Sequence, residues 1–171
     1  KSPELIARYC DQLLRKSPAN ADLMRVEGAL AAIVQVFVYV DDQDVFQTFY
    51  AKLLAKRLIH GTSASEDLEG AMIGRLKAVA GYEYTNKLQG MFTDIATSRE
   101  LMTSFSSSKF SKNLQVDFTT MVLATKSWPL QASSTNYTLP APLLDCQNAF
   151  VKFYVKKYEG RKLVWLHQLA K

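Results

Sequence analysis

Cysteine and histidine are scarce in this 171-residue sequence, and their scarcity argues against several kinds of chemistry. Only Cys10 and Cys146 are present, far apart and outside any CxxC or Cys/His spacing, so nothing supports a disulfide framework or a zinc site. His60 and His167 stand outside motifs such as HExxH and GxSxG, and a glycine-rich phosphate loop is also missing. We therefore expect no catalytic residue, no metal site and no cofactor.

Long apolar runs are missing as well. The longest, from Ala29 to Val40, is interrupted by Gln35 and is too short for a bilayer, which requires about 20 residues. The first residues, 1–4, contain neither a start methionine nor the apolar core of a signal peptide. We interpret the sequence as a piece of a longer protein from a reducing, intracellular compartment, without a membrane partner.

The main pattern in the sequence is apolar residues at helical spacing. Hydrophobic residues make up 48% of the sequence and charged residues 22%, which is typical of a globular chain. Start and stop signals divide the first part into five predicted helices. Four of them run from Ser2 to a Ser17-Pro18 break, from a cap at Asn20 or Asp22 through Val38, from Asp41-Asp42 to Gly61, and from a capping box at 63–66 to Gly81. The fifth contains Leu88 and Ile95 and extends to Phe105 if the weak Thr97-Ser98 step does not break it.

The pattern changes after residue 112. Alternation over residues 116–122 predicts a strand, the stretch from Pro142 to Gly160 predicts a sixth helix, and the apolar run that starts at Leu163 predicts a buried strand over residues 163–169. The predicted fold class is mainly α, with a helical bundle over residues 1–112. Residues 113–171 form a small α+β segment that is an incomplete subdomain.

The third predicted helix carries aromatic and leucine residues along one side. Phe49 and Leu53 are expected in the core with their neighbours, because helical spacing beside leucines is more typical of a core than of a base-stacking platform. Three carboxylates, Asp41, Asp42 and Asp44, stand at the start of this helix. Negative charges stabilise a helix at its N-terminus, so we expect this role and not a metal site. This helix is therefore expected to be structural.

Positive charge leaves a second class of function open. The formal net charge is +5, and a basic helical module that binds nucleic acid is the alternative to a protein scaffold. The basic residues clustered in sequence are Lys52, Lys56, Arg57, Lys156, Lys157, Arg161 and Lys162.

Four long segments, in order, resemble consecutive segments of a cullin, most like the cullin-1 type. They are KSPELIARYCDQLLRKS, DVFQTFYAKLLAKRLIHG, SASEDLEGAMIGRLKAVAGYEYTNKLQGMFTDI and FYVKKYEGRKLVWLHQL. The departures concentrate at 106–113 and 132–145, which are expected to be tolerant surface connections. The resemblance implies a four-helix bundle that passes into an α/β subdomain, so one of the five predicted helices is a connecting element.

The resemblance also implies a function and its partners. A cullin is the non-catalytic scaffold of a RING-type, SCF-type ubiquitin ligase, which holds a substrate receptor at one end and a RING-box protein with its E2 ubiquitin-conjugating enzyme at the other. Cullin regulators are further implied partners and nucleic acid is not, while adaptor binding and the lysine that accepts a ubiquitin-like modifier lie outside this sequence. The candidate residues for the RING-box protein are Leu163, Trp165, Leu166, His167 and Leu169. Those for an acidic E2 tail are Arg15, Lys16 and Arg57.

Overall fold

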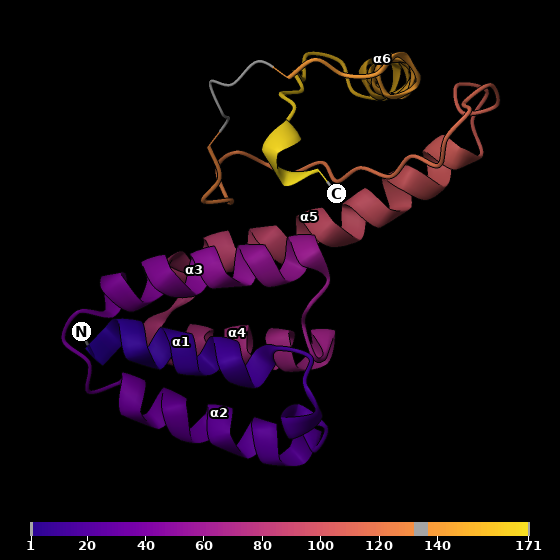
Figure 1. The fold of residues 1–171 in the computed structure, drawn as a ribbon. Coiled ribbons are helices and arrows are strands. Elements are labelled where there is room, and N and C mark those ends of the chain that lie inside the picture. Colours follow the sequence, from indigo (N-terminus) through magenta and orange to yellow (C-terminus); the bar gives the residue numbers. More distant parts are fainter. Residues whose placement is uncertain (1, 132–136, 171) are drawn as a thin grey trace. The chain divides into compact units, whose positions relative to one another are not determined.

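The computed structural model describes residues 2–131 and 137–170, and the regular structure within them is helical (Figure 1). The α-helices are α1 (Ser2–Leu14), α2 (Leu23–Phe37), α3 (Gln43–His60), α4 (Glu66–Ala80), α5 (Tyr82–Ser106) and α6 (Ala141–Lys157). Two short 3-10 turns, η1 (Pro18–Asn20) and η2 (His167–Leu169), complete the set. The predicted mainly α fold class is confirmed. The divergent stretch 132–145 falls partly outside the described residues.

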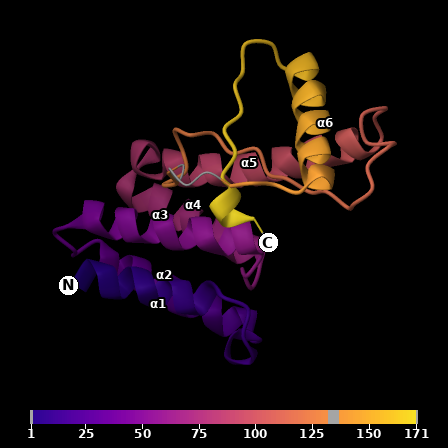
Figure 2. The same ribbon diagram turned by 45° about the horizontal axis from the view of Figure 1, so that its top comes forward.

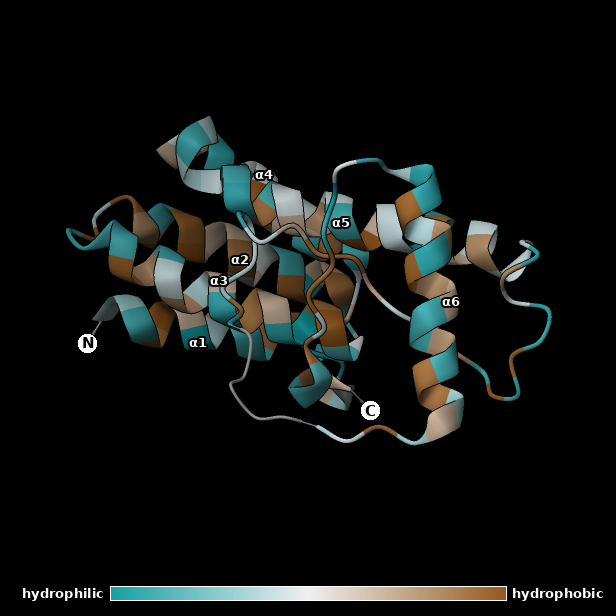
Figure 3. Cartoon of the chain, turned by 90° about the horizontal axis from the view of Figure 1, so that it is seen from above, coloured by the Kyte–Doolittle hydropathy of each residue, from teal (hydrophilic) through white to brown (hydrophobic). Residues whose placement is uncertain are grey.

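The first compact unit contains the chain up to Thr93 together with residues 124–129. Helix α1 packs most extensively on α3, and α2 contacts both α1 and α4. Figure 1 shows α1 lying between α2 and α3. Brown and teal bands alternate along these helices in Figure 3, as expected for helices that each bury one face. This arrangement is the predicted helical bundle.

Capping residues fix where the helices of this unit begin and end. The Asp22 carboxylate accepts a hydrogen bond from the Arg25 backbone N–H at 3.1 Å, and the Ser65 hydroxyl accepts from the N–H groups at the start of α4. At the end of α3, Gly61 adopts the left-handed conformation with φ of 63°, which glycine tolerates without strain. Asn20 has a different task, because its amide donates to two carbonyl oxygens at the end of α1.

The core of the first unit corrects one detail of the prediction. Phe46 and Tyr50 are almost completely buried, and Phe46 packs against Phe37 with ring centroids 4.9 Å apart. Phe49 and Leu53 are only partly buried, so the prediction that they are core residues is wrong. The buried stripe of α3 consists of residues 46, 50, 54 and 58. Residues 49 and 53 each precede a member of this stripe by one position, so their side chains lie beside the stripe and not in it.

The second compact unit contains residues 94–123 and 130–171. Figures 1 and 2 show α6 lying across the C-terminal half of α5, and side chains of these two helices form the core. The buried members are Leu101, Phe105, Phe150, Phe153 and Tyr154. The rings of Phe105 and Phe150 meet edge to face, with centroids 5.3 Å apart and an interplanar angle of 72°, an arrangement that aromatic pairs prefer.

Both predicted strands are absent from the described residues. Residues 116–122 form no helix or strand. At their end, the Val122 N–H donates to the Ser98 hydroxyl at 2.8 Å, and that hydroxyl donates to the Val122 carbonyl at 3.1 Å. Residues 163–166 have no regular structure, and 167–169 form η2. A strand requires a neighbouring strand for its backbone hydrogen bonds, and the described part of the chain supplies none.

Helix α5 contributes to both units without a break. The predicted weak step at Thr97-Ser98 lies inside a continuous helix of 25 residues. The compact units divide after Thr93, whereas the predicted domain boundary after residue 112 marks the change of sequence pattern and stays a prediction.

Candidate partner-binding sites

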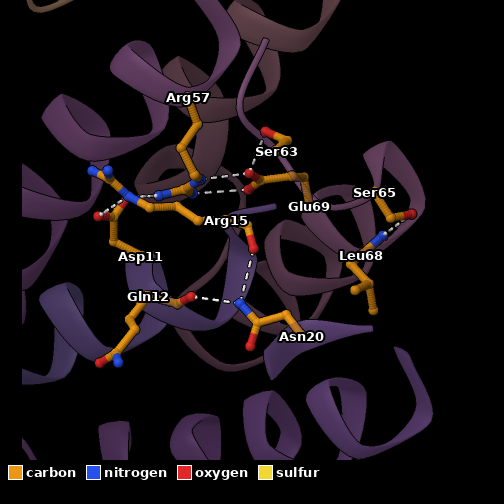
Figure 4. A network of polar contacts seen from close by, with 9 residues as sticks. All are labelled: Asp11, Gln12, Arg15, Asn20, Arg57, Ser63, Ser65, Leu68 and Glu69. Atoms are coloured by element: carbon orange, nitrogen blue, oxygen red, sulfur yellow. Dashed lines mark hydrogen bonds and ion pairs between the residues drawn. The ribbon is translucent and has the colours of Figure 1, made fainter. Parts of the chain in front are cut away.

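A buried ion-pair network joins three helices of the first unit (Figure 4). The guanidinium of Arg57 on α3 donates to both carboxylate oxygens of Glu69 on α4, at 2.6 and 2.9 Å. Its remaining terminal nitrogen donates to Asp11 on α1 at 2.6 Å. The Ser63 hydroxyl adds a bond of 2.8 Å to Glu69. The side chains of Arg57 and Glu69 are both fully buried, so this network is part of the core.

Charge is retained at the centre of this network. Burial by itself would lower the pKa of the Arg57 guanidinium, but the hydrogen bonds and charge of Glu69 outweigh burial and raise that pKa above its ordinary value. The guanidinium also lies over the Tyr50 ring, 5.6 Å from its centroid. Burial raises the pKa of the Tyr50 hydroxyl well above its usual range. The Arg57 guanidinium therefore keeps its charge throughout the ordinary pH range.

Arg57 was a predicted contact for an acidic tail, and the structure corrects that prediction. Its guanidinium is fully buried and bonded to Glu69 and Asp11. An approaching acidic tail would have to displace two carboxylates that are already in place. We therefore remove Arg57 from the candidate site and treat it as a structural residue.

Arg15 and Lys16, the other two candidates, lie at the exposed end of α1. The Arg15 side chain is 48% exposed and pairs with Asp11 at 2.8 Å, and Lys16 is exposed. Their backbone is held firmly, because Lys16 N–H donates to Thr62 at 2.8 Å and Ala64 N–H donates to the Leu14 carbonyl at 2.7 Å. The end of α1 is thus fixed against the loop that joins α3 to α4, with its two basic side chains at the surface.

The C-terminal candidate residues lie in the second unit, in the irregular residues 163–166 and in η2. Trp165 is partly buried, with its ring centroid 6.2 Å from that of Phe150 and 6.4 Å from that of Phe118. His167 stacks on Trp165, and its Nε2 lies 2.7 Å from the Gln147 side-chain nitrogen. Leu163, Leu166 and Leu169 are partly buried. Val164 points outward and is 74% exposed, so this stretch is anchored on one side and open on the other.

The described residues contain neither a cluster suited to a metal ion nor a helix suited to a membrane. Across residues 2–131 and 137–170, no group of three or more His, Cys, Asp or Glu is placed to hold a metal ion. In the same residues, no helix combines the length and the apolar character needed to cross a membrane. A shallow apolar groove between α1 and α2 is lined by Leu5, Ile6, Tyr9, Ala29, Ala32, Ile33 and Val36.

Comparison with protein families matches both parts of the chain. The family model described as the cullin alpha solenoid domain matches residues 1–102, and the model of the cullin alpha+beta domain matches residues 122–171. The chain therefore belongs to the cullin family, and the predicted helical bundle followed by part of an α+β domain agrees with both matches.

Individual relatives confirm the predicted cullin-1 type. Cullin-1 of Dictyostelium discoideum is 55% identical across the whole chain, cullin-1 of Schizosaccharomyces pombe is 47% identical across the whole chain, and cullin-1 of Caenorhabditis elegans is 42% identical across the whole chain. The matched regions are 23%, 22% and 22% of those three proteins. The chain thus spans less than a quarter of the length of these relatives.

Sequence reasoning missed the buried network because its members are far apart in the chain. Asp11 and Arg57 are separated by 46 positions and Arg57 and Glu69 by 12. One signal was available: Arg57 follows Leu54 by three positions and precedes Leu58, inside the apolar stripe of α3. A cation at such a position needs a buried counter-ion, which Glu69 supplies.

Proposed function

We propose that this chain is a scaffold segment of a cullin-RING ubiquitin ligase of the SCF type, without catalytic residues of its own. Two observations support the proposal: the family matches run in order along the chain, and the three relatives described above, at 42–55% identity, are cullin-1 proteins. The segment would connect the arm that carries a substrate receptor with the RING-box protein and its E2. Such a scaffold acts inside the cell, in the cytoplasm and nucleus, and also meets cullin regulators.

The scaffold contributes to rate by holding two partners near each other. Tethering raises the effective concentration of the E2 active site at the substrate, and a defined geometry raises it further. The ion-pair network of Arg57, Asp11 and Glu69 supports such a role, because it fixes three helices of the bundle to one another. No bond-making group is needed in the segment itself.

The C-terminal stretch is the proposed contact for the RING-box protein. Leu163, Trp165, Leu166, His167 and Leu169 are the candidate residues. Residues 163–166 have no regular structure and pair with no strand among the described residues, so we propose that their backbone groups bind an added strand from the partner. Trp165 would fix the stretch on the aromatic core, and the exposed face around Val164 would receive the partner.

Co-purification tests this contact. We expect a RING-box protein co-expressed with the chain to be retained by it, and Val164→Asp to abolish retention because a carboxylate would be buried in the contact. Val155→Asp is the matched control, since Val155 is 50% exposed on α6 and outside the proposed contact. Retention by the Val164→Asp variant, or equal loss in both variants, would refute the proposed contact.

Arg15 and Lys16 are the proposed contacts for the acidic tail of an E2. Their charges are exposed and their backbone is fixed, and long-range attraction of this kind acts mainly on the association rate. In an assembled ligase, Arg15→Glu with Lys16→Glu should slow E2 association at low salt. Lys52→Glu with Lys56→Glu, which changes the charge by the same amount on exposed α3 positions, should have a smaller effect. Equal rates for both variants would leave Arg15 and Lys16 with the structural role of stabilising the end of α1.

A further inference from the structure

In the second unit, three exposed cations are positioned over neighbouring aromatic rings. Lys109 lies 5.6 Å from the centroid of the Phe110 ring, Lys157 lies 5.9 Å from both the Phe153 and the Tyr158 rings, and Arg161 lies 4.6 Å from the Tyr158 ring. We name these six residues the cation-ring row: Lys109, Phe110, Phe153, Lys157, Tyr158 and Arg161.

Two of the three rings in this row are in contact with each other. Phe110 and Phe153 meet edge to face with centroids 6.3 Å apart, and Phe153 belongs to the buried core of the unit. Cations over ring faces are attracted by the ring quadrupole, so each cation has a preferred position. Lys109, Lys157 and Arg161 are all exposed. The row therefore presents positive charges that are restrained before any partner arrives, which reduces the entropy lost on binding.

We propose that the cation-ring row binds an acidic peptide segment, rich in Asp or Glu, of a partner protein. Between residues 146 and 171 the only acidic side chain is Glu159, so the stretch that carries Lys157 and Arg161 is strongly positive. Carboxylates can pair with an arginine through two parallel hydrogen bonds and with a lysine through one. This surface goes beyond the RING-box and E2 contacts proposed above and shares no residue with them.

The arrangement of the rings disfavours nucleic acid as the occupant. Proteins that bind single strands stack bases on exposed aromatic faces, but here the faces of Phe110, Phe153 and Tyr158 are next to the protein's own cations. Phe153 is moreover only 9% exposed. The rings are thus placed to position cations and not to receive bases.

Fluorescence anisotropy with a labelled oligo-glutamate peptide tests the proposal on the full 171-residue chain. Lys109→Gln, Lys157→Gln and Arg161→Gln together should weaken binding about tenfold at low salt. The matched control removes the same charge at three exposed lysines elsewhere, with Lys52→Gln, Lys56→Gln and Lys87→Gln, and should weaken binding less than about twofold. Equal weakening in the two triple variants would overturn the proposal, because it would reveal only a response to net charge.

Three further measurements separate the remaining outcomes. Tyr158→Leu keeps every charge but removes the ring under Lys157 and Arg161, and it should weaken binding severalfold if the rings position the cations. A carbodiimide that joins carboxylates to amines in contact should link the unmodified protein to the peptide at Lys109 or Lys157. Linkage at Lys16 alone would support the E2-tail proposal and refute this one. Tighter binding of oligothymidine than of oligo-glutamate, lost in the same triple variant, would assign the row to nucleic acid instead.

Discussion

Arg57 on α3 and Asp11 on α1 are 46 positions apart in sequence, yet their side chains are joined at 2.6 Å inside the bundle. The same guanidinium holds Glu69 on α4 through two hydrogen bonds. A single cation therefore connects three helices, and its partners are the reason that a charged side chain is tolerated in the core.

Removing one charge from this network should destabilise the bundle strongly. In Glu69→Gln the shape is nearly kept, but the Arg57 cation loses its fully buried counter-charge, so we expect a loss of about 3–5 kcal/mol in the free energy of unfolding. Glu27→Gln is the control, because Glu27 pairs with Arg75 at 2.7 Å on the exposed surface, where a pair contributes about 0–1 kcal/mol. Chemical denaturation measures both. Similar small losses in the two variants would mean that water reaches the network.

Alkaline pH should weaken the fold through Cys10. Burial raises the pKa of the Cys10 thiol from 9.0 to about 12, so above pH 9 the unfolded chain loses a proton that the folded protein keeps. The stabilising contribution is complete below pH 9 and is lost as pH rises toward 12. The free energy of unfolding should therefore fall more steeply with pH in the natural chain than in Cys10→Ala, by up to about 1.4 kcal/mol per pH unit. Parallel slopes from pH 9 upward would show that Cys10 is not buried.

Two glycines in helix interiors should respond in opposite ways to alanine. A Cβ at Gly90 would collide with the Ser127 side chain, so Gly90→Ala should cost about 1–3 kcal/mol through overpacking. A Cβ at Gly28 on α2 meets nothing within 4 Å, and Gly28→Ala should stabilise by about 0.5–1 kcal/mol. Thermal denaturation compares them. If Gly90→Ala also stabilises, the segment that carries Ser127 does not pack on α5 at this position.

Alanine substitutions at two phenylalanines test which residues of α3 form its buried stripe. Phe46→Ala should cost about 3–5 kcal/mol because its ring is 1% exposed and contacts Phe37 and Tyr50. Phe49→Ala, at a partly buried position, should cost less than about 2 kcal/mol. Urea denaturation of both variants ranks the positions. A larger loss at Phe49 than at Phe46 would restore the stripe expected from the sequence.

Local signals predicted the helices well. Asp22, one of two expected caps, begins α2, and Gly61 ends α3, because each of these effects depends on a residue and its immediate neighbours. The capping box expected at 63–66 was wrong in its cap, since Ser65 and not Ser63 caps α4. The sequence left open whether the fifth helix breaks at Thr97-Ser98, and the structure has one continuous helix there. Features that depend on one turn of backbone can therefore be predicted from a single sequence.

Predictions that depend on distant partners were less successful. Arg57 resembled a solvated cation because its counter-ions lie on other helices. The stretch around Trp165 has the apolar content of a strand, but a strand forms only with a neighbour, which the described residues do not provide. Of the candidate site, Arg15 and Lys16 are exposed as expected, whereas their binding roles stay predictions.

The most direct test of the scaffold account is ubiquitin transfer by a full-length cullin that carries this segment with Glu69→Gln. The assay temperature is set above the melting transition of the variant bundle and below that of the natural one. The account predicts that transfer to receptor-bound substrate falls by roughly tenfold or more, because effective concentration is lost, while discharge of the E2 to free lysine by the RING-box protein is unchanged. Unchanged transfer to substrate with a melted bundle would contradict it.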